Sequence, residues 1–127
     1  LVKVCDIGAE VLAFELDMNA VTERAVPVAT ELSKYPSVRR DLALVVPENT
    51  PWAALEASLK GALGPLLREV LLFDRYVGTG LEPGSKSLAM GLILQDVSRT
   101  LTDLESESAV QKALAALAED CSAKLRG

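Results

Sequence analysis

The alternation of side chains over residues 86–95 constrains the fold more than any other feature of the chain. Every second position is a large apolar residue, namely Leu88, Met90, Leu92 and Leu94. The positions between them are small or mixed, namely Ser87, Ala89, Gly91, Ile93 and Gln95. A period of two residues is that of a β-strand whose successive side chains point to opposite faces. The segment is therefore predicted to be a strand with one face in the core and one face left open.

Three more strands and two helices are predicted around it. Leu42, Leu44 and Val46 alternate with Arg39, Asp41, Ala43 and Val45 in a strand stopped by Pro47. In the strand over 66–77, Leu71, Phe73 and Val77 are expected on one face and Asp74 and Tyr76 on the other. A short final strand over 123–126 is expected to turn Leu125 inward and Lys124 and Arg126 outward.

The helices are recognised by their N-termini and apolar stripes. Thr50 and Pro51 are predicted to be the N-cap and first residue of a helix with apolar residues at Trp52, Leu55, Leu59 and Leu63, ending at Gly64. Thr102 and Glu105 have the spacing of a capping box, before a stripe formed by Val110, Ala113, Leu114, Leu117 and Cys121.

The resulting order, β-α-β-β-α-β, predicts an α+β fold of the ferredoxin-like split βαβ type. Its four-stranded antiparallel sheet carries two helices on one face. This domain is expected over residues 33–127. Residues 1–32 form a separate leading segment and connector, in which the alternation over 11–18 predicts another strand. The start at Leu1, without methionine, suggests that the natural chain is longer.

The face without helices is predicted to carry Ala43, Asp74, Tyr76, Ser87, Ala89, Gly91, Ile93 and Arg126. Small side chains leave room for a planar ligand, Tyr76 offers a stacking surface, and Asp74 and Arg126 can bond the polar edges of bases. An exposed antiparallel face that merely turns polar residues to water is the equally simple interpretation. The pattern alone leaves both open.

Composition excludes several classes of function. The chain has no histidine, which removes Ser-His-Asp and Cys-His catalysis and His-ligated metal sites. Cys5 and Cys121 lie far apart without C-x-x-C spacing, so neither a zinc site nor a redox pair is indicated. No apolar run approaches the roughly 20 residues that span a bilayer. With two free thiols and no spanning segment, the sequence predicts a soluble, cytoplasmic protein with no membrane partner, and the pattern assigns neither a metal site nor a catalytic residue.

The charge of −5 argues at first against a nucleic-acid partner. Residues 1–32 account for most of it, with 2 basic and 6 acidic side chains, whereas residues 33–127 hold 11 and 12. Within that second part, the helix over 102–120 carries 5 acids and 1 base, so the remainder is mildly basic. Phosphate attraction is expected to be modest, and stacking and base-edge contacts to carry much of any recognition.

Three local motifs have simpler interpretations than catalysis. Residues 78–87 contain glycines and Lys86, but Ser85 precedes the lysine and a strand follows, so a hairpin loop is predicted instead of a phosphate-binding loop. Asp41, Asp74, Asp96 and Asp103 show no spacing of a general acid and base pair. The adjacent Arg39 and Arg40 are expected on opposite faces of a strand, where one could contact a nucleic acid and the other could pair with Asp41 or a helix end. A solvated strand end is the equally simple interpretation.

Several blocks in this order resemble a known family. They are Tyr35-Pro36-Ser37-Val38-Arg39-Arg40-Asp41-Leu42-Ala43, Phe73-Asp74-Arg75-Tyr76, Lys86-Ser87-Leu88-Ala89, Arg99-Thr100-Leu101-Thr102-Asp103 and the terminal Lys124-Leu125-Arg126-Gly127. Together they are similar to the C-terminal ferredoxin-fold anticodon-binding domain of the bacterial phenylalanyl-tRNA synthetase beta subunit, over about residues 33–127. The leading segment, with Ala13-Phe14-Glu15-Leu16, resembles the end of the catalytic-like module that precedes this domain.

The resemblance implies a non-catalytic domain that grips the anticodon stem-loop of tRNA(Phe). The phenol of Tyr76 would stack on the first anticodon base, Asp74 and Ser87 would bond its edge, and Val38, Ala43 and Arg126 would line the rest of the pocket. Arg39, Lys86 and Lys124 are candidate phosphate contacts. ATP and magnesium would serve the parent enzyme, in which the alpha subunit joins the beta subunit in an alpha2-beta2 heterotetramer.

Two functions from other classes remain compatible with the predicted topology. One is a ferredoxin-like regulatory domain that binds a small molecule. The other is an acylphosphatase-like hydrolase, since fold alone does not decide function. The hydrolase would need an anion-binding loop after the first strand, and Pro47-Glu48-Asn49-Thr50-Pro51 is poorly suited to hold phosphate.

Overall fold

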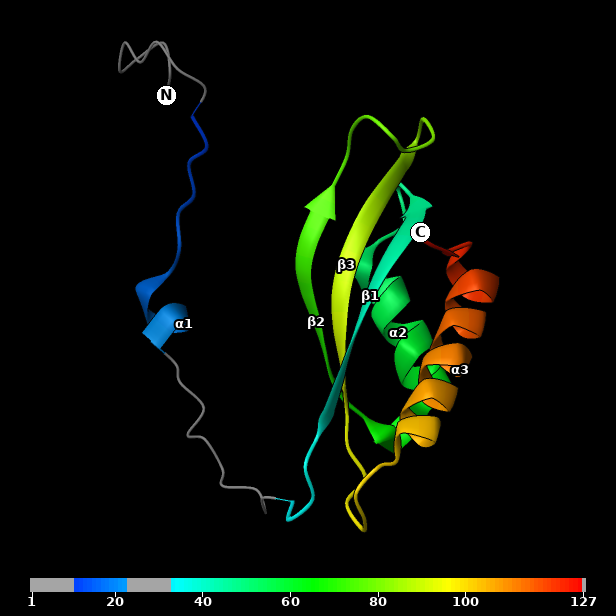
Figure 1. The fold of residues 1–127 in the computed structure, drawn as a ribbon. Coiled ribbons are helices and arrows are strands. Elements are labelled where there is room, and N and C mark those ends of the chain that lie inside the picture. The colour runs from blue at the N-terminus through cyan, green and yellow to red at the C-terminus, as the bar shows by residue number, and fades with distance from the viewer. Residues whose placement is uncertain (1–10, 23–32, 127) are drawn as a thin grey trace. The chain divides into compact units, whose positions relative to one another are not determined.

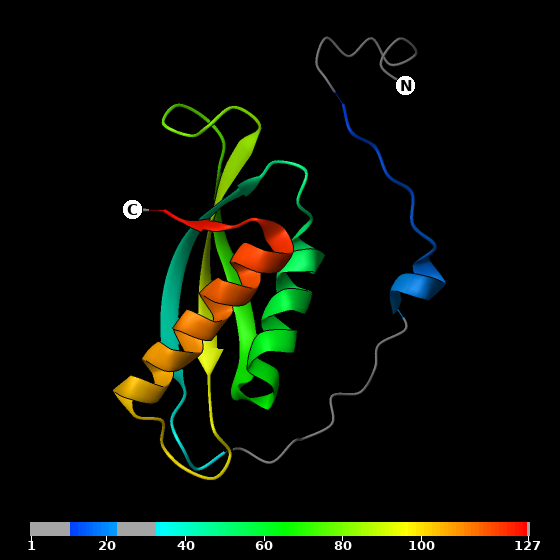
Figure 2. The ribbon, with the colours of Figure 1, turned by 90° about the vertical axis from the view of Figure 1, so that its right-hand side faces the viewer.

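The computed structural model describes residues 11–22 and 33–126, which belong to two units of the chain, Leu1–Glu31 and Leu32–Gly127. In the second unit the chain runs through β1 (Val38–Pro47), α2 (Trp52–Leu63), the 3-10 turn η1 (Gly64–Leu66), β2 (Leu67–Tyr76), β3 (Ser85–Leu94), α3 (Asp103–Cys121) and β4 (Lys124–Leu125). The strands form one antiparallel sheet in the order β2-β3-β1-β4. Both α2 and α3 cover the same face of this sheet (Figures 1 and 2). The predicted α+β fold of the ferredoxin-like type is confirmed.

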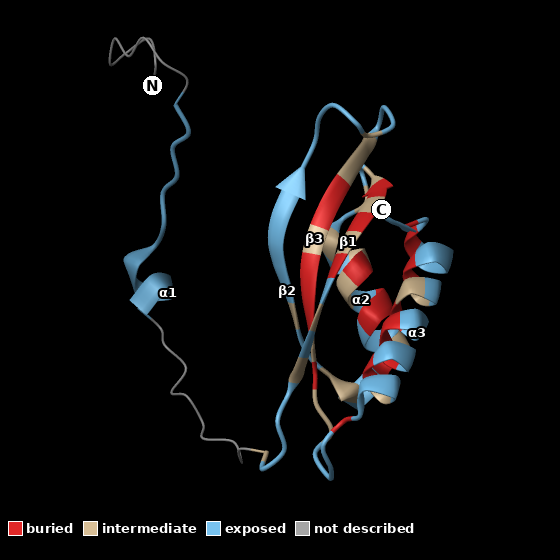
Figure 3. Cartoon of the chain, in the orientation of Figure 1, coloured by how far each residue is buried: buried red, intermediate tan, exposed pale blue. Residues whose placement is uncertain are grey.

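The core lies between the sheet and the two helices. Its completely buried large side chains come from β1, β3, α2 and α3, and they are Leu44, Val46, Leu55, Leu59, Met90, Leu92, Leu94 and Leu117. Figure 3 shows this distribution, with buried residues along β3, β1 and the inner sides of the helices and a mostly exposed β2. The alternation that predicted β1 and β3 is thus the alternation between a helix-covered face and an open face.

Local signals explain how α3 begins and how the chain returns to the sheet. The Thr102 hydroxyl accepts a hydrogen bond from the backbone N–H of Glu105 at 3.3 Å, and the Glu105 carboxylate accepts from the N–H of Thr102 at 2.9 Å. The predicted capping box is therefore confirmed. At the other end, Ser122 adopts a left-handed conformation with φ 52°, which turns the chain toward β4.

A β-bulge in β2 overturns the predicted face assignment of this strand. Leu72 pairs with Met90 and Asp74 pairs with Ala89, so Phe73 is an extra residue without a partner on β3. Paired residues of adjacent strands point to the same side. Leu71, opposite Gly91, therefore lies on the open face together with Asp74 and Tyr76, and its predicted place on the helix-covered face was wrong.

Two smaller predictions also needed correction, and a third holds only in part. Thr50 does not cap α2: the N-cap is Pro51, without a side-chain hydrogen bond, and the Thr50 carbonyl accepts from Lys86 Nζ at 2.6 Å. Leu125 pairs with the buried Leu44 and so lies on the helix-covered side as predicted, but on the edge strand β4 it stays 59% exposed. The two-residue β4 is shorter than the predicted strand over 123–126.

In the leading unit, residues 11–17 are not a strand, and α1 (Met18–Thr22) follows them. An alternating segment becomes a strand only when another strand supplies hydrogen-bond partners, and among the described residues the sheet consists of β1 to β4. Cys121 is buried and free, whereas Cys5 lies outside the described residues. Within 11–22 and 33–126, no helix has both the length and the apolar character needed to cross a membrane.

Candidate nucleic-acid interface

The open face of the sheet is arranged in rows that cross β2, β3 and β1. One row contains Tyr76, Ser87 and Val45, and the next contains Asp74, Ala89 and Ala43. Two further rows are formed by Leu71, Gly91 and Asp41, and by Glu69, Ile93 and Arg39. Every residue predicted for the open face of β1, β2 and β3 lies in these rows.

Arg126 joins the first two rows into a cluster. Its backbone N–H donates to the Ala43 carbonyl at 2.8 Å, which extends the ladder of β4 and places Arg126 beside β1. From there its Nη1 donates to Ser87 Oγ at 3.2 Å, and its guanidinium carbon lies 5.5 Å from the centre of the Tyr76 ring. A guanidinium within about 6 Å of a ring centre is in cation–π range. The cluster therefore combines residues from β4, β3 and β2.

Small residues make this reach possible. Arg126 has to cross β1 to arrive at β3, and the residue opposite it on β1 is Ala43. Asp74 lies in the same row as Ala43, on the exposed edge strand, and leaves its carboxylate open to solvent. Ser87 is only 4% exposed, because Tyr76 and Arg126 lie around it.

The loop after β2 holds the Tyr76 ring, which sequence reasoning missed. The Tyr76 hydroxyl donates to the Thr79 carbonyl at 3.0 Å. A Cβ atom on Gly78 would lie 2.7 Å from the Tyr76 hydroxyl oxygen, so only glycine leaves room for the ring in this position. The signal in the sequence was the glycine two residues after the tyrosine, but the contact depends on the path of the hairpin loop.

A hollow of about 420 Å³ adjoins the cluster at the C-terminal end of the chain. Its lining includes Val45, Glu82, Lys124 and Arg126. Lys124 Nζ lies 4.0 Å from the Glu82 carboxylate, and both side chains are largely exposed. This ion pair therefore contributes little to stability, and Lys124 can leave Glu82 for another anionic partner. The hollow thus has two cationic residues in its lining, of which Arg126 also lies over the Tyr76 ring.

Two residues predicted for the interface lie elsewhere. Val38 pairs with the fully buried Leu94 and packs against the core, so it faces the helices at the opposite end of β1 from Arg126. Lys86 pairs with Val46, and its ammonium is already bonded to the Thr50 carbonyl. The structure does not bring these two side chains to the cluster.

Arg39 and Arg40 point to opposite faces, as predicted. Arg40 Nη2 lies 3.1 Å from Asp103 Oδ1 at the start of α3, on the helix-covered side. Arg39 lies on the open face, where its Nε donates to Asp41 Oδ1 at 2.7 Å and its guanidinium carbon is 5.4 Å from the centre of the Phe73 ring. The bulge that brings Phe73 here was not visible in the residue pattern.

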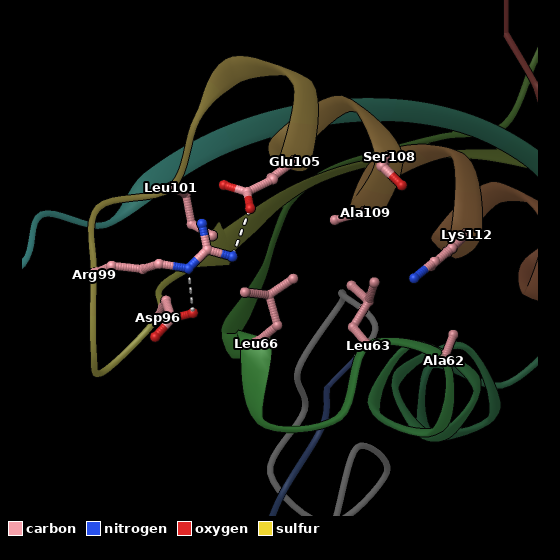
Figure 4. A pocket seen from close by; sticks show the side chains of 10 residues that line it. All are labelled: Ala62, Leu63, Leu66, Asp96, Arg99, Leu101, Glu105, Ser108, Ala109 and Lys112. Carbon is pink, nitrogen blue, oxygen red and sulfur yellow. Dashed lines mark ion pairs between the residues drawn. The ribbon is translucent and has the colours of Figure 1, made fainter.

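A second hollow, of about 240 Å³, lies on the helix side between the end of α2 and the start of α3 (Figure 4). Arg99 points between Asp96 and Glu105 in this hollow and forms ion pairs with both. The pKa of Glu105 is lowered to about 2, first by its hydrogen bond from Arg99 and then by those from Thr102. Arg99, Asp96 and Glu105 are thus paired with one another, and the pair of Arg99 with Glu105 connects the loop after β3 to the N-terminal cap of α3.

Within residues 11–22 and 33–126 the acidic side chains do not assemble into a metal centre. Among the described residues there is no group of three or more His, Cys, Asp or Glu side chains that could hold a metal ion. Asp41 and Asp103 are each paired with an arginine, and Asp96 accepts hydrogen bonds from Ser98. The loop over 77–84 joins β2 to β3 as a hairpin, which confirms that prediction.

Comparisons with a family model and with individual proteins all lead to the same domain family. The family described as the ferredoxin-fold anticodon binding domain matches residues 33–126. The chain is 57% identical over 127 residues to the protein named phenylalanine–tRNA ligase beta subunit in Xanthomonas campestris pv. campestris (strain 8004). It is 48% identical over 126 residues to the protein of that name in Xylella fastidiosa (strain Temecula1 / ATCC 700964). These alignments cover 100% and 99% of this chain but only 16% of either relative.

Proposed function

Because the chain belongs to the family of ferredoxin-fold anticodon binding domains, we propose that its open sheet face binds the anticodon stem-loop of tRNA(Phe). The cluster of Tyr76, Arg126 and Ser87 is the observation that carries this proposal. It places an aromatic ring, a guanidinium and a hydroxyl within contact of one another on an uncovered sheet. Unstacked bases of single-stranded RNA are recognised by such groups, through stacking and through hydrogen bonds to base edges.

Arg126 has a defined part in this recognition. In the chain without RNA it bonds the Ser87 hydroxyl and lies over the Tyr76 ring. A base that stacks at this place meets either the ring or the plane of the guanidinium. Once Arg126 turns from Ser87 toward the RNA, the hydroxyl becomes free to bond the base edge, and the Asp74 carboxylate can accept from an exocyclic amino group.

The charges near the cluster support binding of modest electrostatic strength. Lys124 and Arg126 border the hollow next to the cluster and can approach phosphates of the same loop. Lys86, which is bonded to Thr50, and Arg40, which is paired with Asp103, lie on the other side of the sheet. Stacking and base-edge contacts then supply most of the specificity, because phosphate contacts carry no sequence information.

The chain spans about a sixth of the length of the relatives it matches. We therefore propose that it serves as the anticodon-binding part of a phenylalanine–tRNA ligase beta subunit in the cytoplasm. ATP-dependent attachment of phenylalanine would take place elsewhere in that enzyme, with an alpha subunit as partner in an alpha2-beta2 assembly and ATP and magnesium bound outside this part. Residues 1–32 would be the end of the preceding catalytic-like module.

Binding of a fluorescently labelled tRNA(Phe) anticodon stem-loop, followed by anisotropy, tests the proposal. The comparison RNA has the same stem and a scrambled loop. Tyr76→Ala is expected to weaken binding of the cognate loop by about 1–3 kcal/mol, the usual contribution of base–aromatic stacking. Tyr76→Phe, which retains the ring and loses only the bond to Thr79, should lose much less.

Glu107→Ala, on the exposed outer side of α3, is the matched control and should bind like the unaltered chain. Equal binding of the two loops, or unchanged binding by Tyr76→Ala, would contradict the proposal.

A further inference from the structure

A second cluster on the open face has the same chemical components as the first. Phe73, Arg39 and Asp41 supply an aromatic ring, a guanidinium and a carboxylate, as Tyr76, Arg126 and Asp74 do near the C-terminus. The Arg39 guanidinium carbon lies 5.4 Å from the centre of the Phe73 ring, and its Nε is 2.7 Å from Asp41 Oδ1. All three side chains are about half exposed, at 52%, 54% and 54% for Arg39, Asp41 and Phe73.

The bulge and one glycine shape this second cluster. Phe73 is the extra residue of β2, so its ring reaches the open face without displacing a paired neighbour. Arg39 lies across β3 above Gly91, where a Cβ atom would be 3.0 Å from Asp41 Oδ1 and 3.1 Å from Arg39 Nε. Gly91 therefore leaves a flat place in the sheet in which the arginine can lie.

Stability does not account for this arrangement. An ion pair with both side chains half exposed contributes little, typically 0–1 kcal/mol, and a half-exposed phenylalanine loses much of the benefit of burial. Asp41 does hold the guanidinium over the ring, and an arginine plane so held is a stacking surface for a base. Its carboxylate is also placed to accept from an exocyclic amino group.

We propose that Arg39 and Phe73 form a second stacking platform, which takes another base of the same RNA loop. This inference rests on the proposed function. Ser87 of the first cluster and Gly91 of the second are four residues apart on β3, which corresponds to about 13 Å at the rise of a strand. Neighbouring stacked nucleotides are separated by about 3.4 Å. The two platforms therefore accommodate bases that are not adjacent, with at least one nucleotide bridging the row of Asp74, Ala89 and Ala43.

The decisive experiment couples protein variants to single abasic positions in the loop of the tRNA(Phe) anticodon stem-loop, measured by anisotropy with the full chain. Phe73→Leu keeps apolar bulk and removes the aromatic ring. It is expected to weaken binding of the intact loop by about tenfold, within the range known for base–aromatic stacking. With the RNA that lacks the base stacked on Phe73, the same variant should bind less than about twofold more weakly than the unaltered chain, because the stacking contact is already missing.

Tyr76→Leu should show the same coupling at a different, non-adjacent loop position. Arg39→Gln and Arg40→Gln provide a matched pair, with equal charge changes at neighbouring positions on opposite faces of β1. Arg39→Gln is expected to lower affinity and to be coupled to the same abasic position as Phe73→Leu. Arg40→Gln, whose side chain is paired with Asp103, should leave binding within about twofold, the loss of one exposed charge.

Circular dichroism melting of each variant shows whether the fold is intact. If Phe73→Leu binds like the unaltered chain while Tyr76→Leu does not, the second platform is overturned and the proposed function stands. The same holds if Phe73→Leu weakens binding equally at every abasic position, since its role is then not to stack a base. If neither Tyr76→Leu nor Phe73→Leu changes binding, the proposed function itself fails.

Discussion

The two faces of the sheet are built by the same strands and differ in every other respect. The helix-covered face carries leucines, valines and a methionine that are almost completely buried. The open face carries two arginine–aromatic pairs, small residues and two aspartates, and most of them are accessible. Since neighbouring residues of a strand point to opposite faces, one residue contributes to stability and the next to binding. A single step along β1 or β3 should therefore separate the two properties.

The largest expected effect comes from the pair Leu92 and Ile93. Leu92 is completely buried under the helices, whereas Ile93 lies on the open face. Leu92→Ala should lower the free energy of unfolding by about 2–5 kcal/mol, because it removes buried apolar atoms and leaves a cavity. Ile93→Ala should cost about 1 kcal/mol. Urea denaturation of both variants checks this, and losses of similar size would mean that the two faces are not distinct in stability.

Gly78→Ala tests whether the position of the Tyr76 ring matters separately from its presence. The added methyl group would collide with the Tyr76 hydroxyl and displace the ring from the Thr79 carbonyl. We expect RNA binding to weaken by about 1–2 kcal/mol, part of the full stacking contribution. The midpoint of thermal unfolding should stay nearly constant, because the loop is exposed. A large drop in stability with unchanged affinity would reverse this assignment.

The salt dependence of RNA binding measures the electrostatic share of the open face. With about two phosphates neutralised, the logarithm of the association constant should fall with the logarithm of salt concentration with a slope of about −1.4. Lys124→Gln should reduce the magnitude of the slope by about 0.7. Tyr76→Leu should lower affinity at all salt concentrations with the slope unchanged. An anisotropy titration series provides these slopes, and a much steeper slope for the unaltered chain would point to a larger phosphate footprint.

The smallest effect concerns the helix side and should leave the open face unaffected. The pKa of Glu105 is lowered to about 2 by Arg99 and Thr102, from a usual value of 4.5. A lowered pKa in the folded state means that the unfolded state binds the proton more readily. The contribution of Glu105 to stability is thus complete above about pH 5 and is lost between pH 4.5 and 2.

Glu105→Gln should remove that part of the pH dependence while stability near neutral pH falls slightly. Thermal unfolding of both chains between pH 2 and 7 is the measurement. RNA binding by Glu105→Gln at neutral pH should equal that of the unaltered chain, because Glu105 lies on the opposite side of the sheet from Tyr76. Parallel pH curves for the two chains would show that Glu105 does not titrate as described.

Much of the fold was predictable because it depends on local signals. The alternation around Leu44 and Leu92 gave the correct faces for β1 and β3, and the spacing of Thr102 and Glu105 correctly placed the start of α3. The family resemblance, drawn from blocks such as Val38-Arg39-Arg40-Asp41, is confirmed over residues 33–126. These features can be predicted because each depends on a few neighbouring residues. A capping hydrogen bond requires polar side chains at a fixed spacing, and a strand with one buried face requires an apolar residue at every second position.

Features that depend on distant partners were less predictable. The bulge at Phe73 was missed because an extra residue is tolerated only where β3 accepts the shifted register. Thr50 is a residue type common at N-caps, but its side chain does not cap α2, and its backbone carbonyl accepts a hydrogen bond from Lys86 on β3. Val38 matches the family pattern as a site residue, yet its strand position turns it toward Leu94 and the core.

The sequence by itself determined the α+β fold, the two helices, the alternation of two unlike faces and the placement of Ala43, Asp74, Tyr76, Ser87 and Arg126 on the open one. Only the tertiary structure decided which of these side chains touch. Arg126 meets Ser87 and Tyr76 because β4 lies beside β1, and Arg39 meets Phe73 because a bulge and Gly91 leave room for it. Side-chain periodicity assigns a face to each residue, whereas strand order and register bring residues from distant parts of the chain together.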